Sequence, residues 1–321
     1  MNKLKKVGLT ALATTLVASS AYAGELSVSG SASLSYSGLD NTNQTNPWTM
    51  ANSVTFAGGG ELDNGMTVGV SFELDDDIMD DYKMTLGLAD DMGTITFSGD
   101  SVNAGGVDTV KDIIPTAYTP VYEVADEATA VDNGLATTSG RNTTGMFGYA
   151  NSIAGIDYSI GFNPTNGTTS AALNPGSETS IGLSYNTPLE GLRVVAGFMA
   201  DDNISDNSTY GVSYTMGPVV VAYQKTEVDY DTVAASTLSV ADQDAEHMGI
   251  SFAINENLTI SGGIQEVDIS GQTLNEENSG VAVSYTMGSI TMAVQRNKLE
   301  NGSGTAANDA TANIVNLAFA F

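Results

Sequence analysis

The chain has 321 residues and a formal net charge of −28, with 38 acidic residues against 10 basic ones and no cysteine. This balance excludes the basic patches that nucleic-acid binding requires, and the missing cysteines exclude a disulfide framework. Glycine is abundant and proline scarce, with 35 and 7 residues respectively. That composition suits many strands joined by tight turns.

The first residues are typical of an export signal. Three lysines lie among the first six residues, a short apolar run follows over 7–18, and residues 21–23 form a small-x-small cleavage site. We therefore expect a signal peptide over 1–23 and a single mature domain over 24–321. The apolar run is too short for a membrane anchor, and no later stretch reaches the ~20 apolar residues of a spanning helix.

The first mature segment alternates with a period of two residues. Serine occupies every odd position from Ser27 to Ser37, whereas apolar or small residues fill the even positions from Leu26 to Tyr36. A helix would spread these serines around its surface, but a strand collects them on one face. This segment alone fits a membrane strand and an amphipathic strand of a soluble sandwich equally well.

Segments with the same alternation recur along the chain and predict sixteen strands. We place them at 25–37, 48–60, 66–75, 81–90, 94–101, 140–150, 156–163, 178–187, 192–200, 208–216, 218–227, 245–254, 258–269, 278–287, 289–299 and 310–321. Alternate connections are short turns in which Gly or Asn supplies a positive φ, and the others are longer polar loops. An even number of strands with short turns at one end and long loops at the other is the pattern of outer-membrane barrels.

An acidic run lies between the third and fourth predicted strands. It places five carboxylates in a short loop, those of Asp75, Asp76, Asp77, Asp80 and Asp81. Like charges repel unless a cation lies among them, so Ca²⁺ or Mg²⁺ is the candidate ligand. The spacing does not match an EF-hand, and a solvated acidic loop is the alternative.

The longest interruption, over 102–139, is a candidate constriction loop. A loop of this length is usually functional. Its middle, 113–122, is apolar enough to pack on a surface, and Lys111 is its lone base. We expect it to fold into the lumen and to present acids that favour cations, namely Asp108, Asp112, Glu123, Asp126 and Glu127. A surface excursion without fixed structure is the alternative.

The alternation also selects charged side chains for the pore wall. Those on the inward parity are Glu73, Lys83, Asp100, Asp157, Glu178 and Arg193. Arg141, Lys225, Arg296 and Lys298 fall on the outward parity near the loop ends of their strands, where they meet headgroups or turn inward at a bulge. Among these four, Arg141 is a weaker candidate for the pore wall. Solvated rim charges are the alternative for each residue.

Aromatic residues precede several of the short turns. Near-copies of one short motif end in Tyr185, Tyr214, Phe252 and Tyr285, at irregular spacing. With Tyr149 and Phe319, they predict an aromatic girdle at the inner membrane interface. A solenoid or propeller is the alternative, but rigid repeats keep a constant period.

Catalysis has little support in the sequence. His247 is the only histidine, and it faces the lumen if Met248, Ile250 and Phe252 face outward. A lone histidine forms neither a triad nor a metal cluster. We therefore expect no enzymatic activity and no cofactor other than Ca²⁺ or Mg²⁺ at the acidic loops.

The last segment alternates as well and ends on an aromatic residue. Val315, Leu317, Phe319 and Phe321 share one parity. A closed barrel needs a strand here because its last strand pairs with its first. Phe319 and Phe321 are therefore the predicted closure residues.

This layout resembles the Gram-negative general porins, most closely those of Rhodobacter-like α-proteobacteria. The likeness rests on Ala21-Tyr22-Ala23, the mature start at Gly24, the strand pattern, the long third loop and Phe321. It implies an all-β fold: a 16-stranded antiparallel transmembrane β-barrel with short periplasmic turns, long outer loops and a constriction loop in the lumen. It also implies a homotrimer in the outer membrane.

The resemblance implies a water-filled channel for passive diffusion of small hydrophilic solutes and ions. In that family the loop carboxylates oppose an arginine cluster on the wall. This chain has few bases to form such a cluster, which predicts cation preference. A solute-specific porin, with Tyr118 and Tyr122 as its candidates, and a non-transport surface barrel such as an adhesin are the alternatives. The implied partners are outer-membrane lipid or lipopolysaccharide and the barrel-assembly machinery, with no nucleic acid.

Overall fold

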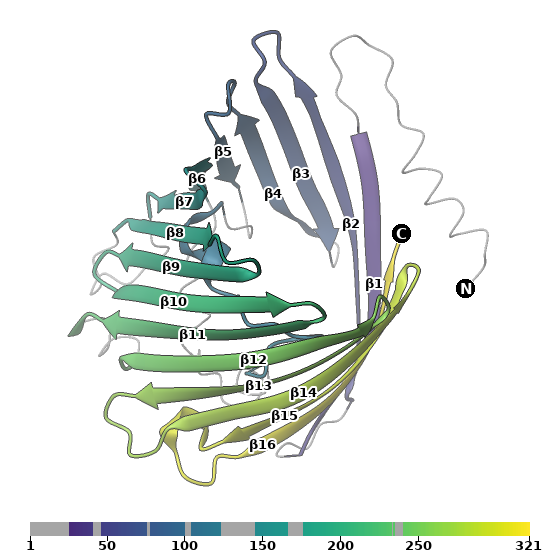
Figure 1. The fold of residues 1–321 in the computed structure, drawn as a ribbon, viewed down its shortest axis with the longest axis vertical. Helices are drawn as coiled ribbons and strands as arrows, with labels where there is room; N and C mark the ends of the chain where they lie inside the picture. Colours follow the sequence, from purple (N-terminus) through teal and green to yellow (C-terminus); the bar gives the residue numbers. More distant parts are fainter. Residues whose placement is uncertain are drawn as a thin grey trace.

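A single closed sheet makes up the molecule (Figure 1). The computed structural model describes residues 26–40, 46–75, 78–99, 104–122, 145–165, 176–232, 234 and 240–321. In these residues sixteen antiparallel strands each pair with their neighbours in sequence, and β1 pairs with β16. Closure gives the backbone groups of both terminal strands a partner, which hydrocarbon surroundings require. Among the same residues no helix has the length and apolar character to cross a bilayer.

The predicted number and order of strands are confirmed. The strands are β1 (Leu26–Leu39), β2 (Trp48–Glu61), β3 (Thr67–Asp75), β4 (Ile78–Gly87), β5 (Thr94–Ser98), β6 (Met146–Ile153), β7 (Ile156–Asn163), β8 (Glu178–Asn186), β9 (Leu192–Asp201), β10 (Ser205–Met216), β11 (Val219–Tyr230), β12 (Gln243–Asn255), β13 (Leu258–Ile269), β14 (Glu276–Met287), β15 (Ile290–Glu300) and β16 (Ala310–Ala320).

One difference from the expected boundaries lies at the start of β4. This strand begins at Ile78 rather than at residue 81, because a bulge lets the pairing continue through the acidic run. The register slips between Ser71 and Glu73, and Asp81 takes a positive φ of 48°. A bulge of this kind adds one unpaired residue without ending the strand. Asp80 and Asp81 therefore belong to a strand and not to a loop.

Polarity is inverted relative to a soluble protein. Large apolar side chains are exposed on the outer face, for example Val70 on β3 and Ile250 on β12, which are 47% and 49% exposed. The opposite face carries buried polar side chains, among them Ser98, Gln224 and Asn297. Alternation along each strand thus gives an apolar exterior and a polar interior.

Short turns at one end connect β2–β3, β4–β5 and every second pair thereafter. A positive φ occurs at the glycine of six of them, Gly65, Gly93, Gly155, Gly191, Gly217 and Gly288. In the β12–β13 turn, the Asn255 side chain accepts hydrogen bonds from the N–H groups of Asn257 and Leu258 at 2.9 and 3.0 Å. These backbone conformations and hydrogen bonds confirm the prediction that the short connections are tight turns.

The predicted girdle aromatics lie at this same end of the barrel. Tyr185, Tyr214, Phe252 and Tyr285 each lie within three residues of the last residue of β8, β10, β12 or β14. Tyr149 of β6 donates its hydroxyl to the Met92 carbonyl in the adjacent turn at 2.6 Å. Rings with a polar tip at this level suit a membrane interface.

The seam between β1 and β16 closes on the terminal aromatic residues. Gly30 and Phe321 exchange two backbone hydrogen bonds of 2.7 and 2.9 Å, and Ala32 pairs with Phe319. A Cβ on Gly30 would meet the Phe321 ring, so this ring covers Gly30. Gly30 therefore makes room for an aromatic ring of the same chain.

The long-loop end of the seam is fastened by Asp40. Its N–H donates to the Thr311 carbonyl at 3.1 Å, and its carboxylate accepts the Thr311 N–H at 2.7 Å. The hydrogen bond from this N–H lowers the pKa of Asp40 below its usual value. Both ends of the seam are thus held by short contacts beyond the regular ladder.

Replacing the terminal ring should weaken closure of the barrel. Phe321→Ala uncovers Gly30, and we expect it to reduce the free energy of unfolding by about 1–2 kcal/mol, because part of an aromatic side chain loses its apolar contacts. Urea unfolding in detergent micelles measures this change. Phe162→Ala, on the outer face of β7 away from the seam, is the control. An equal loss in both variants would contradict a special role for Phe321.

Candidate functional site

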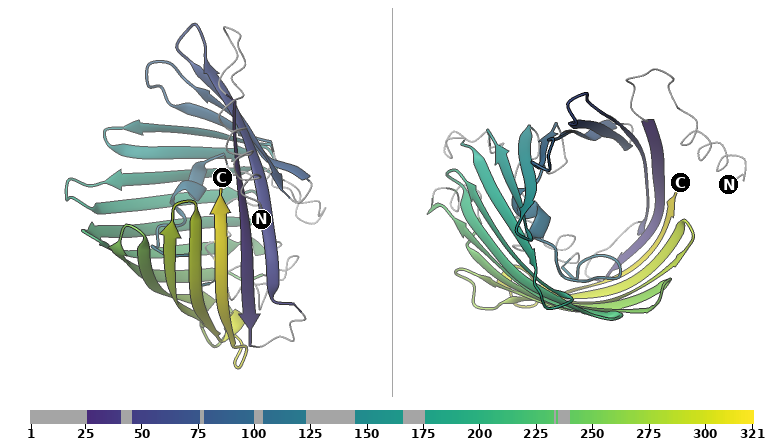
Figure 2. Two further views of the ribbon diagram at one scale, coloured as in Figure 1. Left: turned by 90° about the vertical axis from the view of Figure 1, so that its right-hand side faces the viewer. Right: turned by 45° about the horizontal axis from the view of Figure 1, so that its top comes forward.

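The described part of the long loop, residues 104–122, lies inside the ring of strands (Figure 2). It begins with the short 3-10 helix η1 (Gly106–Val110), which contacts β7, β8 and β9. The segment after η1 continues along the inner face as far as β15, where Thr119 reaches Gln295. The loop therefore crosses the lumen against one side of the wall.

Glycines on the inner wall lie directly beneath this loop segment. One inward glycine comes from each of seven strands, and we call this set the glycine track: Gly148, Gly161, Gly182, Gly197, Gly211, Gly249 and Gly263. A Cβ on Gly148 would overlap the backbone oxygen of Ala104, and one on Gly182 would overlap the backbone oxygen of Gly106. The loop backbone thus approaches the wall more closely than any side chain would allow.

An apolar cluster holds η1 on the wall. Val107 and Val110 are almost fully buried, and they pack with Val195 and Met199 of β9 and with Ile113 of the loop. Removing these side chains from water favours the docked position by the hydrophobic effect. Further along the loop, Ile114 and Val121 lie against the wall at Gly249 and Gly263.

Amide and hydroxyl side chains of the wall hydrogen-bond the loop backbone. The Gln224 amide donates to the Val110 carbonyl at 3.1 Å, and its oxygen accepts the Ile113 N–H at 3.3 Å. The Ser261 hydroxyl accepts the Ala117 N–H at 2.7 Å. A chain without secondary-structure partners has its buried backbone groups satisfied in this way.

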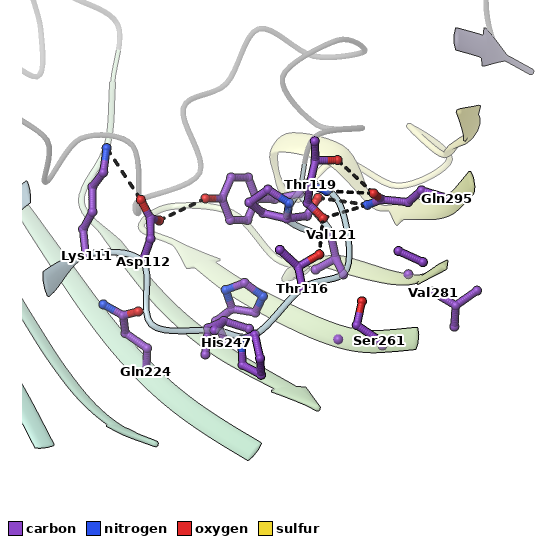
Figure 3. Close-up of a pocket in the computed structure, with 18 residues that line it drawn as sticks. Lys111, Asp112, Thr116, Thr119, Val121, Gln224, His247, Ser261, Val281 and Gln295 are labelled. Atoms are coloured by element: carbon purple, nitrogen blue, oxygen red, sulfur yellow. Dashed lines mark hydrogen bonds and ion pairs between the residues drawn. The ribbon is translucent and has the colours of Figure 1, made fainter. Parts of the chain in front are cut away.

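Gln295 makes the last of these contacts with both ends of its amide (Figure 3). Its oxygen accepts the Thr119 N–H at 3.0 Å, and its NH₂ group donates to the Thr119 carbonyl at 2.9 Å. The neighbouring Asn297 donates to the Pro120 carbonyl at 3.2 Å. None of these wall residues was among the sequence-predicted sites, because their partners lie more than a hundred residues away in the chain.

The charges of the described loop segment are paired within it. Lys111 Nζ lies 2.9 Å from the Asp108 carboxylate and 3.8 Å from that of Asp112. The Tyr122 hydroxyl donates to Asp112 at 3.4 Å (Figure 3). Burial raises the pKa of Asp112 above its ordinary value, although Lys111 opposes the shift. One base therefore serves two acids, and one negative charge is left over.

The structure places five of the predicted wall charges on the inward face. Glu73 and Lys83 lie on β3 and β4, Asp157 and Arg193 line one cavity, and Glu178 is 1% exposed at the start of β8. Asp75 and Asp81 lie in β3 and β4, and the side chain of Asp80 is not described. The other predicted site residues lie outside the described residues, namely Asp76, Asp77, Asp100, Glu123, Asp126, Glu127 and Arg141.

Three of the bases on the outward parity, Lys225, Arg296 and Lys298, face outward and do not turn inward at a bulge. Lys225 pairs with Glu227 at 2.6 Å, Lys298 pairs with Glu300 at 2.7 Å, and Arg296 donates to Asn313 at 3.0 Å. They belong to an acidic band on the outer wall, at the long-loop end of β10 to β15, in which Asp206 lies opposite Asp229 and Glu246 opposite Glu266. Across the described chain, no three His, Cys, Asp or Glu side chains are grouped closely enough to hold a metal ion.

His247 faces inward beneath the loop, as the alternation indicated. It is 2% exposed, and its ring lies 5.7 Å from the Tyr122 ring in an edge-on arrangement. The two residues share a cavity of about 170 Å³ between loop and wall (Figure 3). Neither imidazole nitrogen has a hydrogen-bond partner among the described residues.

Filling the glycine track should lift the loop from the wall. Gly182→Val places a side chain where the Gly106 oxygen lies, and we expect overpacking to destabilise the docked loop by about 1–3 kcal/mol. The loop then moves towards the pore axis, so unitary conductance in planar bilayers falls and current fluctuations increase.

The matched control is Gly262→Val on the outer face of β13, where the nearest atom to a new Cβ is 3.5 Å away. This variant should conduct like the unmodified chain. Unchanged conductance in Gly182→Val would contradict close seating of the loop on the wall.

Solved structures with the same architecture cover almost the whole chain. OmpF of Salmonella typhi, in complex with daunomycin, is 14% identical with a TM-score of 0.66 and covers 93% of this chain and 98% of its own. OmpT, an outer membrane protein of Vibrio cholerae, is 12% identical with a TM-score of 0.68, covering 96% and 100%. A mutant of the Rh. blastica porin is 15% identical with a TM-score of 0.61, covering 92% and 100%.

These identities are low enough that the structures establish the fold alone. No curated protein sequence matches the chain. The family model of the Gram-negative porins, however, matches residues 8–320, which is nearly the full length. The closed barrel, its inverted polarity and the loop in its lumen agree with that match. The chain therefore belongs to the Gram-negative porin family and forms a channel of the outer membrane.

Proposed function

We propose that this channel passes small hydrophilic solutes and ions by passive diffusion and that it prefers cations. The observation that carries the proposal is the loop on the inner wall, whose single base is already paired with two carboxylates. Solutes that cross the barrel pass this segment. Its leftover negative charge acts where the path is narrowest, in the manner of acidic rings in other cation channels.

Charged side chains of the wall add to the negative electrostatic potential along the path. Glu73, Asp157 and Glu178 face the lumen, against Lys83 and Arg193 as the inward bases of the described strands. The remainder of the loop contributes Glu123, Asp126 and Glu127 by sequence and no further base before residue 141. A surplus of acid along a water-filled path raises the local concentration of cations.

General diffusion is favoured over a solute-specific pathway. A specific pathway needs aromatic and polar side chains exposed along the lumen, and Tyr122 is instead 8% exposed against His247. Tyr118 is left as the single tyrosine of the described loop that is partly exposed. The family match and the loop inside the lumen likewise favour a channel over a structural surface barrel.

Salt-gradient measurements in planar bilayers test this proposal. We expect single-channel steps and a reversal potential of the sign that cation selectivity gives. Asp108→Asn with Asp112→Asn leaves Lys111 unpaired. We therefore expect the cation-to-anion permeability ratio to fall roughly twofold or more, a modest change because water and salt screen exposed charges. Asp206→Asn with Asp229→Asn removes two acids from the outer wall and should leave the ratio unchanged.

The pH dependence gives the same test a second arm. A carboxyl with a raised pKa is ionised above that pKa and neutral below it, so Asp112 loses its charge at a higher pH than an ordinary aspartate. As pH falls from neutrality, cation preference should begin to decline at a higher pH than an aspartate of ordinary pKa would cause, and Asp112→Asn should lack this part of the decline. Anion preference of the unmodified chain, or silent membranes, would contradict the proposal.

We also infer a homotrimer in contact with outer-membrane lipid or lipopolysaccharide and inserted by the barrel-assembly machinery. Resemblance to the trimeric porins supports this. The outer face of β2 and β3 next to the seam carries a groove of about 520 Å³, whose lining includes four glycines and the apolar side chains of Phe56, Val70 and Phe72. Ca²⁺ or Mg²⁺ bound among the loop acids is a further proposal, supported by their crowding in the sequence.

Crosslinking in native membranes should give trimers. A large residue in the groove, as in Gly58→Trp, should shift the products towards monomers, because it occupies space that close barrel packing requires. The control is Thr179→Trp on the outer face of β8, far from the groove. Monomers alone from the unmodified chain would rule the trimer out.

A further inference from the structure

A cavity of about 570 Å³ lies on the inner wall at the short-turn side of η1. Its lining comes from the β4–β5 turn, from the ends of β6 and β8, from the starts of β7 and β9, and from Thr109 and Val110 of η1. Three charged side chains reach it, Asp91, Asp157 and Arg193. The cavity therefore combines one base with two acids next to the path that a solute follows past the loop.

Arg193 is fixed at one end and open at the other. Its Nε donates to the Ser184 hydroxyl at 2.8 Å. Its two terminal nitrogens have no hydrogen-bond or ion-pair partner among the described residues. A guanidinium oriented in this way presents parallel N–H groups, the geometry that matches a carboxylate.

Asp157 lines the same cavity as this guanidinium but is not paired with it. Asp157 on β7 is directly opposite Ser184 on β8. Arg193 on β9 is opposite Asn186, which also belongs to β8. Ser184 therefore lies between the two charges on the same inward face. No ion pair joins them, and no described residue pairs with the carboxylates of Asp157 or Asp91.

We propose that this cavity binds small zwitterions of the free amino acid class, with Arg193 taking the carboxylate and Asp157 the ammonium group. Asp91, from the turn, lines the same cavity and adds to the acidic side. This inference rests on the proposed function, because it names a solute class for the same diffusion path.

The charge pattern distinguishes zwitterions from other solutes. A simple anion gains from Arg193 but meets Asp157 and Asp91, and a simple cation meets the guanidinium. A solute with both charges satisfies both partners, and neutral solutes of equal size gain neither contact. Because the site is open to water, its preference should be modest, which suits a channel that must also release its solutes.

Swelling of proteoliposomes tests the assignment with two matched solutes. Alanine is a zwitterion, and lactamide is uncharged and nearly the same shape, so neither builds up a membrane potential. We expect alanine to enter the unmodified channel about threefold faster than lactamide, the scale of weak exposed charge contacts. In Arg193→Gln and in Asp157→Asn the ratio should fall towards one. In Arg193→Lys it should be intermediate, because an ammonium point charge replaces the parallel N–H groups of the guanidinium.

Lys83→Gln is the control, since it removes an inward base outside this cavity and should keep the threefold ratio. Lactamide entry reports that each variant is folded and open, so a variant that fails to insert is recognised by the loss of both rates. An alanine-to-lactamide ratio near one in the unmodified channel, or a ratio that Arg193→Gln and Asp157→Asn leave unchanged, would overturn the zwitterion site. If lactamide fails to enter the unmodified channel, the diffusion function itself is wrong.

Discussion

The fold depends on the requirement that every backbone N–H and C=O within hydrocarbon has a partner. An open sheet leaves two unpaired edges, and in lipid no water is available to satisfy them. Pairing of β1 with β16 removes both edges, and the contacts at Gly30 and Asp40 fasten the seam at its two ends. The short turns, the long loops and the outward apolar side chains all follow from closing the ring in a membrane.

Closure also creates the problem that the inner loop solves. Sixteen strands enclose a ring too wide for wall side chains to fill, so the lumen stays open to water. The loop narrows it, but its backbone then needs partners away from any strand. Gln224, Ser261 and Gln295 supply them from the wall, and the apolar cluster around Val107 supplies the contact that keeps η1 in place.

Much of the barrel was predictable from alternation alone, because a period of two residues is a local signal. The start of β4 was not, since the bulge at Asp81 lets a strand run through a charge-rich stretch that reads as a loop. Parity also identified the inward charges such as Asp157 and Arg193. It did not identify their environment, because the serine that separates them is contributed by a third strand. Glycines at inward positions of consecutive strands were a signal for the glycine track, but single glycines in strands are equally compatible with bulges.

The glycine track also bears on how such channels diversify. A surface made of main chain is the same whatever side chains the loop carries, so residues of the loop that point into the water path can be exchanged without matching changes in the barrel. The barrel wall and the loop are thereby free to vary independently, and new permeation properties can arise by substitution in one short stretch of sequence.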